Sequence, residues 1–396
     1  MSADDTPAEA ALRAEVRAWM EVHAAGYGPA TAHIRLIDTP EFAATARAWQ
    51  RTLAEGGWSV PTWPVEHGGR GLSSNEARII REEETRFAVP AGLFQVASLM
   101  VGPTLMECGT PAQRERFLPG IRGGEHLWCQ LFSEPDAGSD LASLRTRAER
   151  DGDGWAVTGQ KVWTSGAASA DWAILLARTE PGSKRHQGIT YFLCDMRSPG
   201  VEVRPLVQIN RAAHFNEVHL DGVRIPDDLV VGEVGDGWSV ARVTLGAERA
   251  MIGSMNVGDH VDTVLDVARK TGRAADPVVR QHLVDLYVRG TVLRYLGDRV
   301  LTAVRTGGPV GPEASTIKLG LSLFMARLGG VAMQVLDGEG LVEGGDPAAT
   351  DHSSYGRLQD MFLGQWSSRI GGGTEQIQRN LIGERALGLP RDPRPT

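Results

Sequence analysis

Three short stretches of the sequence combine hydroxyl, carboxyl, aromatic and glycine residues that suit a polar, phosphate-bearing ligand. The first, residues 130–140, reads Gln-Leu-Phe-Ser-Glu-Pro-Asp-Ala-Gly-Ser-Asp. Its serine hydroxyls and the backbone N–H groups around Gly138 can donate several hydrogen bonds to one ligand. Proline, aspartate, glycine and serine are also turn residues, so composition alone leaves an ordinary helix-to-strand turn equally open.

The other two stretches are residues 161–166, Lys-Val-Trp-Thr-Ser-Gly, and residues 371–379, Gly-Gly-Gly-Thr-Glu-Gln-Ile-Gln-Arg. Trp163, followed by two hydroxyl residues, offers the aromatic face and donors that an isoalloxazine ring needs. A core tryptophan before a turn is the alternative. In the third stretch the glycines allow close backbone approach, and Thr374 can cap a helix whose N–H groups attract an anion. A hinge before a capped helix is the alternative there.

Changes of hydrophobic period along the chain indicate the elements that must position these stretches. Residues 1–125 and 233–396 have the pattern of helices, whereas residues 126–232 contain short β-rich runs separated by turns. We therefore expect an N-terminal α-helical domain, a small middle β-barrel or sandwich domain and a C-terminal helical bundle. The predicted helices include residues 8–23, 41–55, 74–88, 239–258, 259–271, 277–306, 313–336, 355–369 and 374–387.

Composition excludes several classes of protein. The 396 residues carry a formal net charge of -8, which argues against a nucleic-acid or anionic-membrane surface. We find no apolar run long enough to span a membrane and no apolar signal region, and the three cysteines form no zinc or disulfide pattern. The sequence also lacks a phosphate loop, an H-E-x-x-H motif and a dinucleotide fingerprint. It predicts a cytoplasmic protein without a metal site.

Together the three stretches resemble the acyl-CoA dehydrogenase family, and the resemblance covers essentially the whole chain. Five blocks occur in the family's order and spacing, which is far more specific than one glycine loop. The resemblance implies FAD as cofactor and α,β-dehydrogenation of an acyl-CoA thioester to a trans-2-enoyl-CoA. The blocks are residues 63–71 (Trp-Pro-Val-Glu-His-Gly-Gly-Arg-Gly), 133–140, 161–166, 334–338 (Gln-Val-Leu-Asp-Gly) and 373–379.

The resemblance assigns roles in the middle segment residue by residue. Leu131 and Ser133 would contact the pyrimidine edge of the flavin, and Ser139 the FAD pyrophosphate or the CoA. Trp163 would lie beside the ring, followed by Thr164 in the same block. Ser165 occupies the position where many relatives carry a threonine facing the flavin N5, so here a serine would make the corresponding contact.

In the C-terminal segment the resemblance implies the residues that hold the ADP half of FAD, some of them across a subunit interface. The usual Arg-x-x-Phe-Gly segment of the family is absent, and Arg273 is its expected substitute. The other residues implied for the ADP half are Gln334, Gly338, Thr374 and Gln376.

The general base needs a separate argument, because many relatives place it at a position that is Gly372 here. Residues 244–250, Thr-Leu-Gly-Ala-Glu-Arg-Ala, resemble the isovaleryl-CoA and long-chain dehydrogenases, which makes Glu248 the predicted base. Periodicity agrees, since Ala241, Leu245, Glu248, Ile252 and Met255 form one apolar helical stripe. A lone carboxylate there is costly unless it has a function or a partner. A salt bridge or a solvated helix edge is the alternative.

We expect two further residues, Arg249 and Gly372, to contribute to the substrate site. Arg249 would order the site rather than pair with Glu248, because it points about 100° away on the helix. The thioester carbonyl would be polarised by a flavin ribityl hydroxyl and by the backbone N–H of residue 372. A glycine at position 372 still supplies this N–H, because the interaction uses only the backbone.

The resemblance also implies an electron acceptor and an oligomeric state, and it leaves two alternative functions open. The resemblance implies an electron-transfer flavoprotein as acceptor and a homotetramer or dimer, with a heteromer left open. A flavin oxidase or monooxygenase on the same fold is one alternative, and a non-catalytic or half-site subunit of a heteromer is another. The sequence leaves open the length, branching or steroid nature of the acyl group, and whether its thioester is to CoA or a carrier protein.

Overall fold

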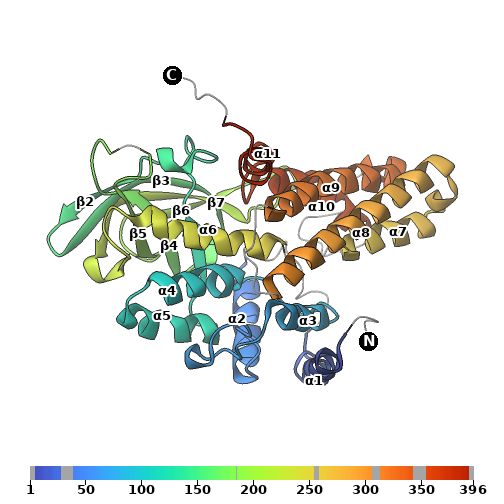
Figure 1. Cartoon of the computed structure of the whole chain (residues 1–396), viewed down its shortest axis with the longest axis horizontal. Coiled ribbons are helices and arrows are strands. Elements are labelled where there is room, and N and C mark those ends of the chain that lie inside the picture. The colour runs from blue at the N-terminus through green and yellow to red at the C-terminus, as the bar shows by residue number, and fades with distance from the viewer. Residues whose placement is uncertain are drawn as a thin grey trace. The chain divides into compact units, whose positions relative to one another are not determined.

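The computed structural model describes residues 5–27, 39–183, 185–253, 258–305, 313–341 and 354–391. The chain forms two compact units, the first made of Met1–Gln208 and Ala212–Ala247, the second of Ile209–Arg211 and Glu248–Thr396. The first unit holds α1 to α5, the sheet and the beginning of α6, and the second holds α7 to α11 (Figure 1). The expected division into residues 1–125, 126–232 and 233–396 stays a prediction.

Side-chain caps determine where the helices of the first unit begin. Thr6, Ser73 and Thr110 each form a capping box that satisfies free N–H groups of the helix that follows. The helix expected at 74–88 ends earlier, because Arg86 and Phe87 bond back to Glu83 and Glu84 in a turn. The bounds are α1 Pro7–His23, α2 Pro40–Glu55, α3 Ser74–Glu84, α4 Gly102–Cys108 and α5 Pro111–Gly123.

A π-helical segment, Val96–Val101, runs directly into α4 and supports a buried tryptophan. Nε1 of Trp63 donates to the carbonyl of Ser98 at 2.9 Å. A Cβ atom on Gly102 would overlap the Trp63 ring, so only glycine fits at this position. The block that begins at Trp63 therefore has a packing role, because its indole holds the π-helical turn in place.

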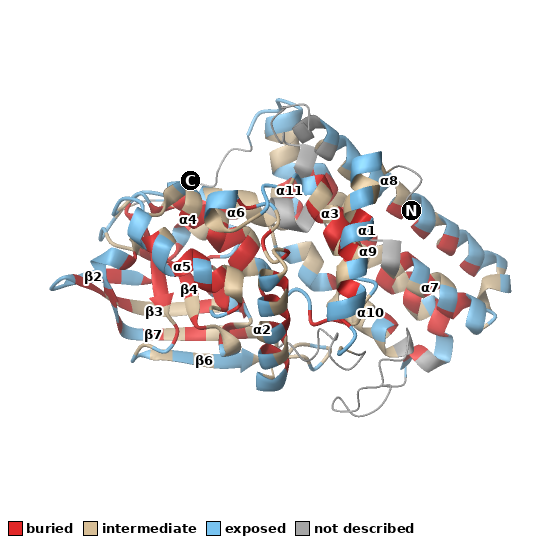
Figure 2. Ribbon diagram, turned by 90° about the horizontal axis from the view of Figure 1, so that it is seen from below, coloured by how far each residue is buried: buried red, intermediate tan, exposed pale blue. Residues whose placement is uncertain are grey.

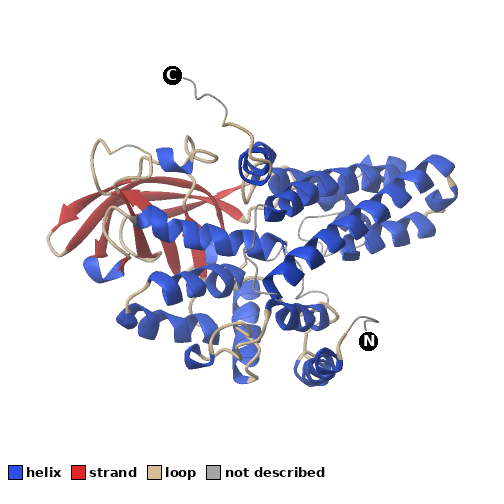
Figure 3. Ribbon diagram, in the orientation of Figure 1, coloured by secondary structure: helices blue, strands red, loops and turns tan. Residues whose placement is uncertain are grey.

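The strands of the first unit form one mostly antiparallel sheet, in the order β6-β7-β3-β2-β4-β5-β8, with β1 pairing in parallel with β4. Figure 3 shows the strands gathered in one region of the chain. Strands β4 and β5 are almost wholly buried. Figure 2, which is coloured by burial, shows strand segments of this unit in red. The bounds are β1 Trp128–Leu131, β2 Arg147–Asp151, β3 Gly154–Ser165, β4 Trp172–Arg178, β5 Ile189–Asp195, β6 Val201–Leu206, β7 Phe215–Pro226 and β8 Val230–Val231.

A buried ion pair joins β3 to the loop that follows β1. Nζ of Lys161 donates to Oε1 of Glu134 at 2.8 Å and to the carbonyl of Phe132 at 3.0 Å. The Glu134 carboxylate also accepts the backbone N–H groups of Arg145 at 2.6 Å and Thr146 at 2.9 Å. One carboxylate thus ties together three separate segments of the chain.

The protonation of this pair follows from its surroundings. Burial alone raises the pKa of the Glu134 carboxyl, but the Lys161 ammonium and the two backbone donors hold that pKa below its usual value. Burial lowers the pKa of Lys161 to about 8, and Glu134 opposes the shift. Both groups are therefore charged at neutral pH, and each is the partner that makes the burial of the other tolerable.

The second unit is a bundle organised around α9. This helix packs against α7, α8, α10 and α11. Its fully buried Leu328, Val331 and Ala332 lie in the hydrophobic core of the bundle. The bounds are α6 Gly237–Gly253, which crosses the boundary between the units, α7 Gly258–Lys270, α8 Pro277–Arg305, α9 Glu313–Leu336, α10 Ser354–Ile370 and α11 Glu375–Leu381.

One part of α9, Ser315–Leu336, is long and apolar enough to cross a membrane by length and mean hydropathy alone, which the sequence analysis did not anticipate. Half of this stretch is buried among the neighbouring helices, and it carries Lys318 and Arg327. Its apolar character is that of the central helix of a bundle.

The predicted fold class is confirmed, with helices before and after a β region. The helix expected at 374–387 differs in detail. It divides into α11 and a π-helical turn, Ile382–Ala386, because the N–H of Leu387 bonds to the carbonyl of Ile382 five residues earlier.

We expect Gly102→Ala to destabilise the protein by about 1–3 kcal/mol, because the new methyl group must displace the buried Trp63 ring. The measurement is the urea midpoint followed by circular dichroism. The matched control is Gly297→Ala in α8, where a Cβ would meet no atom within 4 Å, so stability should hold or rise. Equal stability of Gly102→Ala and the wild type would contradict the packing described.

We expect Lys161→Met to destabilise the protein by roughly 3–5 kcal/mol, because it leaves the Glu134 carboxylate buried without its cation. Lys270→Met, at an exposed lysine in the last turn of α7, should change stability by less than about 0.5 kcal/mol. Thermal and urea unfolding of both variants give the comparison, and similar losses in the two would exclude a special role for Lys161.

Candidate active site

The first predicted stretch forms a closed turn directly after β1. Glu134 and Ala137 exchange both backbone hydrogen bonds at 3.1 Å. Ser133 is half-buried and Ser139 is exposed, so both hydroxyls are accessible to a ligand. Leu131 is fully buried, and its side chain packs in the core of the first unit. Any ligand contact of Leu131 would therefore have to come from its backbone.

The second predicted stretch ends β3 with an irregular backbone. The pairing of β3 with β7 shifts register between Lys161 and Thr164, and Trp163 between them has a φ of 61°. Its ring is 62% exposed and meets the edge of Phe215 at a centroid distance of 6.0 Å. A bulky residue in the left-handed region costs of order 1–3 kcal/mol, and such strain clusters at functional sites.

The structure brings the first two stretches together. The N–H of Val162 donates to the carbonyl of Ser133 at 2.9 Å, one residue before Trp163. The adjacent Lys161 holds Glu134 through the buried ion pair described above. The serine loop and the exposed tryptophan are therefore fixed to each other by a backbone bond and an ion pair.

The two hydroxyl residues after Trp163 differ in accessibility. Ser165 is exposed, whereas Thr164 is 1% exposed, because successive side chains of a strand point to opposite faces. Oγ1 of Thr164 has no hydrogen-bond partner among the described residues, although Nδ2 of Asn216 donates to the Thr164 carbonyl at 3.1 Å. Of this pair, Ser165 is the residue able to contact a ligand at the surface.

In the second unit, Arg273 lies beside the block that begins at Gln334. Its Nη2 donates to the Gln334 carbonyl at 3.4 Å, and its Nη1 lies 3.5 Å from a carboxylate oxygen of Asp337. Gly338 follows and is exposed. Nδ1 of His282 and Oε1 of Gln334 are 2.6 Å apart. The substitute arginine and the expected ADP-binding block are thus neighbours, while Nε of Arg273 is buried with no partner among the described residues.

The third predicted stretch is a glycine turn between α10 and α11. Gly372 and Gly373 have φ values of 65° and 91°, which side-chain-bearing residues rarely adopt. Thr374 caps α11 as expected, since its Oγ1 accepts the N–H of Ile377 at 3.3 Å. Nε2 of Gln378 donates to the carbonyl of Gly372 at 3.2 Å. Gln376 in the first turn of α11 is exposed.

The predicted base lies on α6 at the start of the second unit. Glu248 is half-buried. Ala241 is fully buried and Leu245 half-buried, so the first members of the predicted stripe face inward as expected. The side chains of Ile252 and Met255 lie outside the described residues, as does that of Arg249.

A buried cation acts on Glu248 from α9. Lys318 is 5% exposed, and burial lowers the pKa of its ammonium, whereas the carboxylates of Glu375 and Glu248 raise it. Nζ of Lys318 donates to Oγ of Ser322 at 3.0 Å and to the carbonyl of Ser368 at 2.7 Å. Lys318 therefore interacts both with the carboxylate of the predicted base and with a backbone carbonyl near the end of α10.

The predicted site residues fall into two groups, one in each compact unit. The contacts described above join Ser133 to the segment of Trp163 in the first group and Arg273 to Gln334 in the second. The first group contains Leu131, Ser133, Ser139, Trp163, Thr164 and Ser165, and the second contains Glu248, Arg273, Gln334, Gly338, Gly372, Thr374 and Gln376. Among the described residues, no cluster of three or more His, Cys, Asp or Glu side chains is arranged to hold a metal ion.

Sequence reasoning assigned no role to several residues that organise these groups. Lys161 and Lys318 are two of only four lysines in the chain, and each is at a core-facing position of its element. A rare lysine at a core-facing position could have identified both residues from the sequence, since lysine is almost never fully buried without a partner. Glu134, Asp337 and Gln378 lie inside the blocks quoted in the sequence analysis but received no role there, and nothing in the local pattern marked His282.

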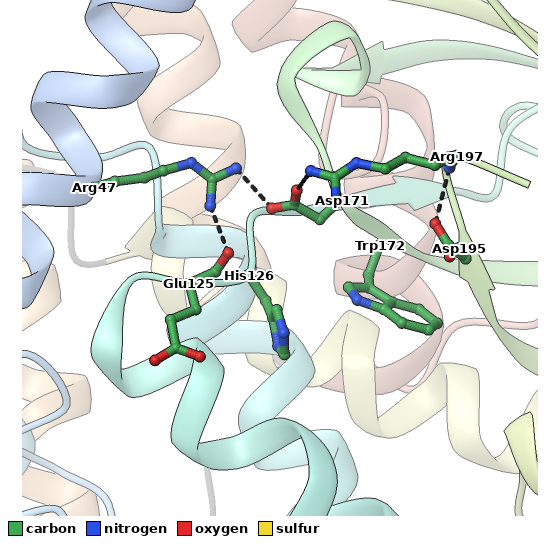
Figure 4. A pocket seen from close by; sticks show the side chains of 7 residues that line it. All are labelled: Arg47, Glu125, His126, Asp171, Trp172, Asp195 and Arg197. Carbon is green, nitrogen blue, oxygen red and sulfur yellow. Dashed lines mark hydrogen bonds and ion pairs between the residues drawn. The ribbon is translucent and has the colours of Figure 1, made fainter.

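A pocket of about 460 Å³ in the first unit lies apart from these groups (Figure 4). Asp171 at its centre accepts the backbone N–H of Leu127 at 2.9 Å, pairs with Arg47 at 2.6 Å and also pairs with Arg197. These interactions lock loops together, and no predicted site residue lines the pocket. Its lining is Arg47, Glu125, His126, Asp171, Trp172, Asp195 and Arg197.

Comparison with known proteins identifies the family. Residues 6–125, 129–223 and 235–387 match the N-terminal, middle and C-terminal domains of acyl-CoA dehydrogenases, respectively. The chain is 40% identical to the acyl-CoA dehydrogenase IpdE1 of Mycobacterium tuberculosis, over 96% of this chain and 98% of that protein. It is 43% identical to the acyl-CoA dehydrogenase FadE34 of the same species, over 86% of this chain but only 46% of FadE34.

Solved structures agree with this assignment. The structure described as Tcur3481-Tcur3483 steroid ACAD is similar with a TM-score of 0.84 and 29% identity, covering 99% of this chain and 100% of that one. The ChsE4-ChsE5 complex from Mycobacterium tuberculosis is similar with a TM-score of 0.77 and 28% identity, covering 99% and 100%. The chain belongs to the acyl-CoA dehydrogenase family of flavoproteins and is an oxidoreductase.

Proposed function

We propose that the protein catalyses the FAD-dependent α,β-dehydrogenation of an acyl-CoA thioester to a trans-2-enoyl-CoA. The observation that carries the proposal is the exposed, strained Trp163, which a backbone bond and a buried ion pair fix beside the Ser133 loop. A strained backbone that presents an apolar ring to solvent costs stability, and ligand binding to that ring gives a reason for the cost.

The residues present fit FAD in both units. In the first, Trp163 and Ser165 offer an exposed aromatic face and a hydroxyl. In the second, Arg273 lies beside Gln334 and its Nε has no partner among the described residues, so the guanidinium offers a charged donor for phosphate. We propose that Ser133, Ser139, Trp163 and Ser165 hold the flavin half of FAD. We propose that Arg273, Gln334, Gly338, Thr374 and Gln376 hold an ADP half, some of them across a subunit interface. Bound FAD would accept the β hydrogen of the substrate as hydride at N5.

The protein itself would remove the proton from the α carbon and stabilise the negative charge that develops there. We assign Glu248 as the base that takes the α proton, and the N–H of Gly372 as a donor to the thioester carbonyl. A donor aimed at the carbonyl oxygen stabilises the enolate-like charge that develops as the proton leaves. The positive φ of Gly372 favours a residue without a side chain, so this position can supply its N–H but not a carboxylate.

We further propose a bulky acyl group, of the steroid class, as the substrate. The support is the similarity to a structure described as a steroid ACAD, together with Gly372, which leaves free the volume that a glutamate side chain would take. A straight-chain acyl group has less surface to fill that space.

The assembly we propose is an oligomer of the acyl-CoA dehydrogenase type, either of identical chains or with a paralogous subunit. Exposed apolar residues on one side of α8, Val284, Val288, Val292 and Tyr295, support burial of this helix in an interface. The similar ChsE4-ChsE5 complex contains two different proteins, which favours testing for a second subunit. We propose an electron-transfer flavoprotein as the acceptor and the cytoplasm as the location.

Anaerobic mixing of the yellow protein with straight-chain, branched and steroid side-chain acyl-CoAs should bleach the flavin band with the steroid class at least about tenfold faster, a difference of about 1.4 kcal/mol in barrier. Stopped-flow absorbance near 450 nm measures the rates. Faster bleaching by straight chains would remove the steroid proposal. Turnover with dioxygen that exceeds turnover with an artificial acceptor would instead favour an oxidase, and failure to take up FAD would favour a half-site subunit.

Glu248→Gln should keep its bound flavin but reduce the bleaching rate by at least about a thousandfold, because the amide cannot accept the α proton. The matched control is Glu233→Gln, at an exposed carboxylate in the loop before α6, which should bleach at the wild-type rate. Near-normal bleaching by Glu248→Gln would show that another group is the base.

A further inference from the structure

Lys318 occupies an unusual position for a lysine. It is 5% exposed in the central helix of the bundle, and its ammonium donates to Ser322 Oγ at 3.0 Å and to the Ser368 carbonyl at 2.7 Å. Oγ of Ser322 donates to the same carbonyl at 2.8 Å. Two side chains of α9 are thus committed to one backbone oxygen of α10.

That oxygen lies at the point where α10 ends. The N–H of Gly371 closes the last turn on Ser367 at 2.8 Å, and the chain then reverses through Gly372. The last carbonyls of a helix carry partial negative charge and lack partners within the helix, so a cation there is favourable. Lys318 and Ser322 therefore fix the direction in which the chain leaves α10 and enters the glycine turn.

The charges around Lys318 come from three elements. Glu248 on α6 and Glu375 at the start of α11 both act on it. Glu375 is paired with Arg369 of α10 at 2.6 Å and also interacts with Arg379 of α11. The carboxylates of Glu375 and Glu248 therefore both favour the charged form of Lys318, in that order, and raise the pKa that its burial lowers.

We propose that Lys318 is a positioning residue for the reaction, which anchors the glycine turn that presents the Gly372 N–H. The inference rests on the proposed function for the role of Gly372. Lys318 itself touches neither substrate nor flavin in this proposal. It acts through the end of α10, where its hydrogen bonds hold the turn that carries the carbonyl donor.

The test compares Lys318→Met and Lys318→Arg with the control Lys270→Met, at an exposed lysine of the same unit. The first readout is hydrogen exchange by mass spectrometry over residues 365–378 of the purified protein. Lys318→Met should exchange about fivefold faster there, because the end of α10 loses its anchor. Lys270→Met should exchange at the wild-type rate.

The second readout is flavin bleaching by the best acyl-CoA, with the maximal rate and the half-saturating acyl-CoA concentration measured separately. A displaced carbonyl donor costs rate rather than binding, so Lys318→Met should bleach at least about tenfold slower at saturation with little change in the half-saturating concentration. Lys318→Arg keeps a cationic donor and should lose less, and Lys270→Met should bleach at the wild-type rate. A wild-type bleaching rate in Lys318→Met would overturn the positioning role, and unchanged exchange would overturn the anchoring.

Ser322→Ala provides a test that does not depend on the folding of Lys318→Met. It removes one donor to the Ser368 carbonyl without changing any charge, so exchange should accelerate and bleaching should slow, both by less than in Lys318→Met. Unchanged exchange in this variant would contradict the anchoring. If the wild type is bleached by no acyl-CoA, the proposed function is wrong, and hydrogen exchange still decides whether Lys318 anchors the turn.

Discussion

The buried ion pair between Lys161 and Glu134 is the constraint on which the first half of the site depends. A carboxylate inside the protein must be fully satisfied, and Glu134 achieves this with an ammonium and two backbone N–H groups. Those donors come from β3 and from the segment leading into β2. The serine loop therefore cannot move independently of the strand that carries Trp163, and the strained φ of Trp163 is held by the surrounding hydrogen bonds.

Lys318 plays a comparable part in the second unit. Its ammonium is satisfied mainly by a hydroxyl and a helix carbonyl rather than by one tight carboxylate. Its charge consequently remains available to act on Glu248 and Glu375. In a chain with 41 basic residues of which four are lysines, arginine makes most of the surface pairs while two lysines serve in the interior.

The unequal accessibility of the predicted site residues has one physical origin. A strand places alternate side chains on opposite faces, so the hydroxyls of Thr164 and Ser165 face different surroundings although they are adjacent in sequence. A turn exposes its side chains, which explains why Ser139 is accessible while Leu131, on β1, is not. Backbone groups are exempt from this rule, so the donor role proposed for the Gly372 N–H does not need a side chain at that position.

The sequence by itself determined the order of helical and β regions, the capping role of Thr374 and the five blocks that mark the family, because these depend on local periodicity and on contiguous motifs. Only the tertiary structure decided that Glu134 forms an ion pair with Lys161, that Arg273 lies beside Gln334, and that Lys318 donates a hydrogen bond to the Ser368 carbonyl. These pairs are separated by 27, 61 and 50 positions in the chain. Contacts at such separations depend on how whole elements pack, and no local pattern encodes which charged side chain will find which partner once water is excluded.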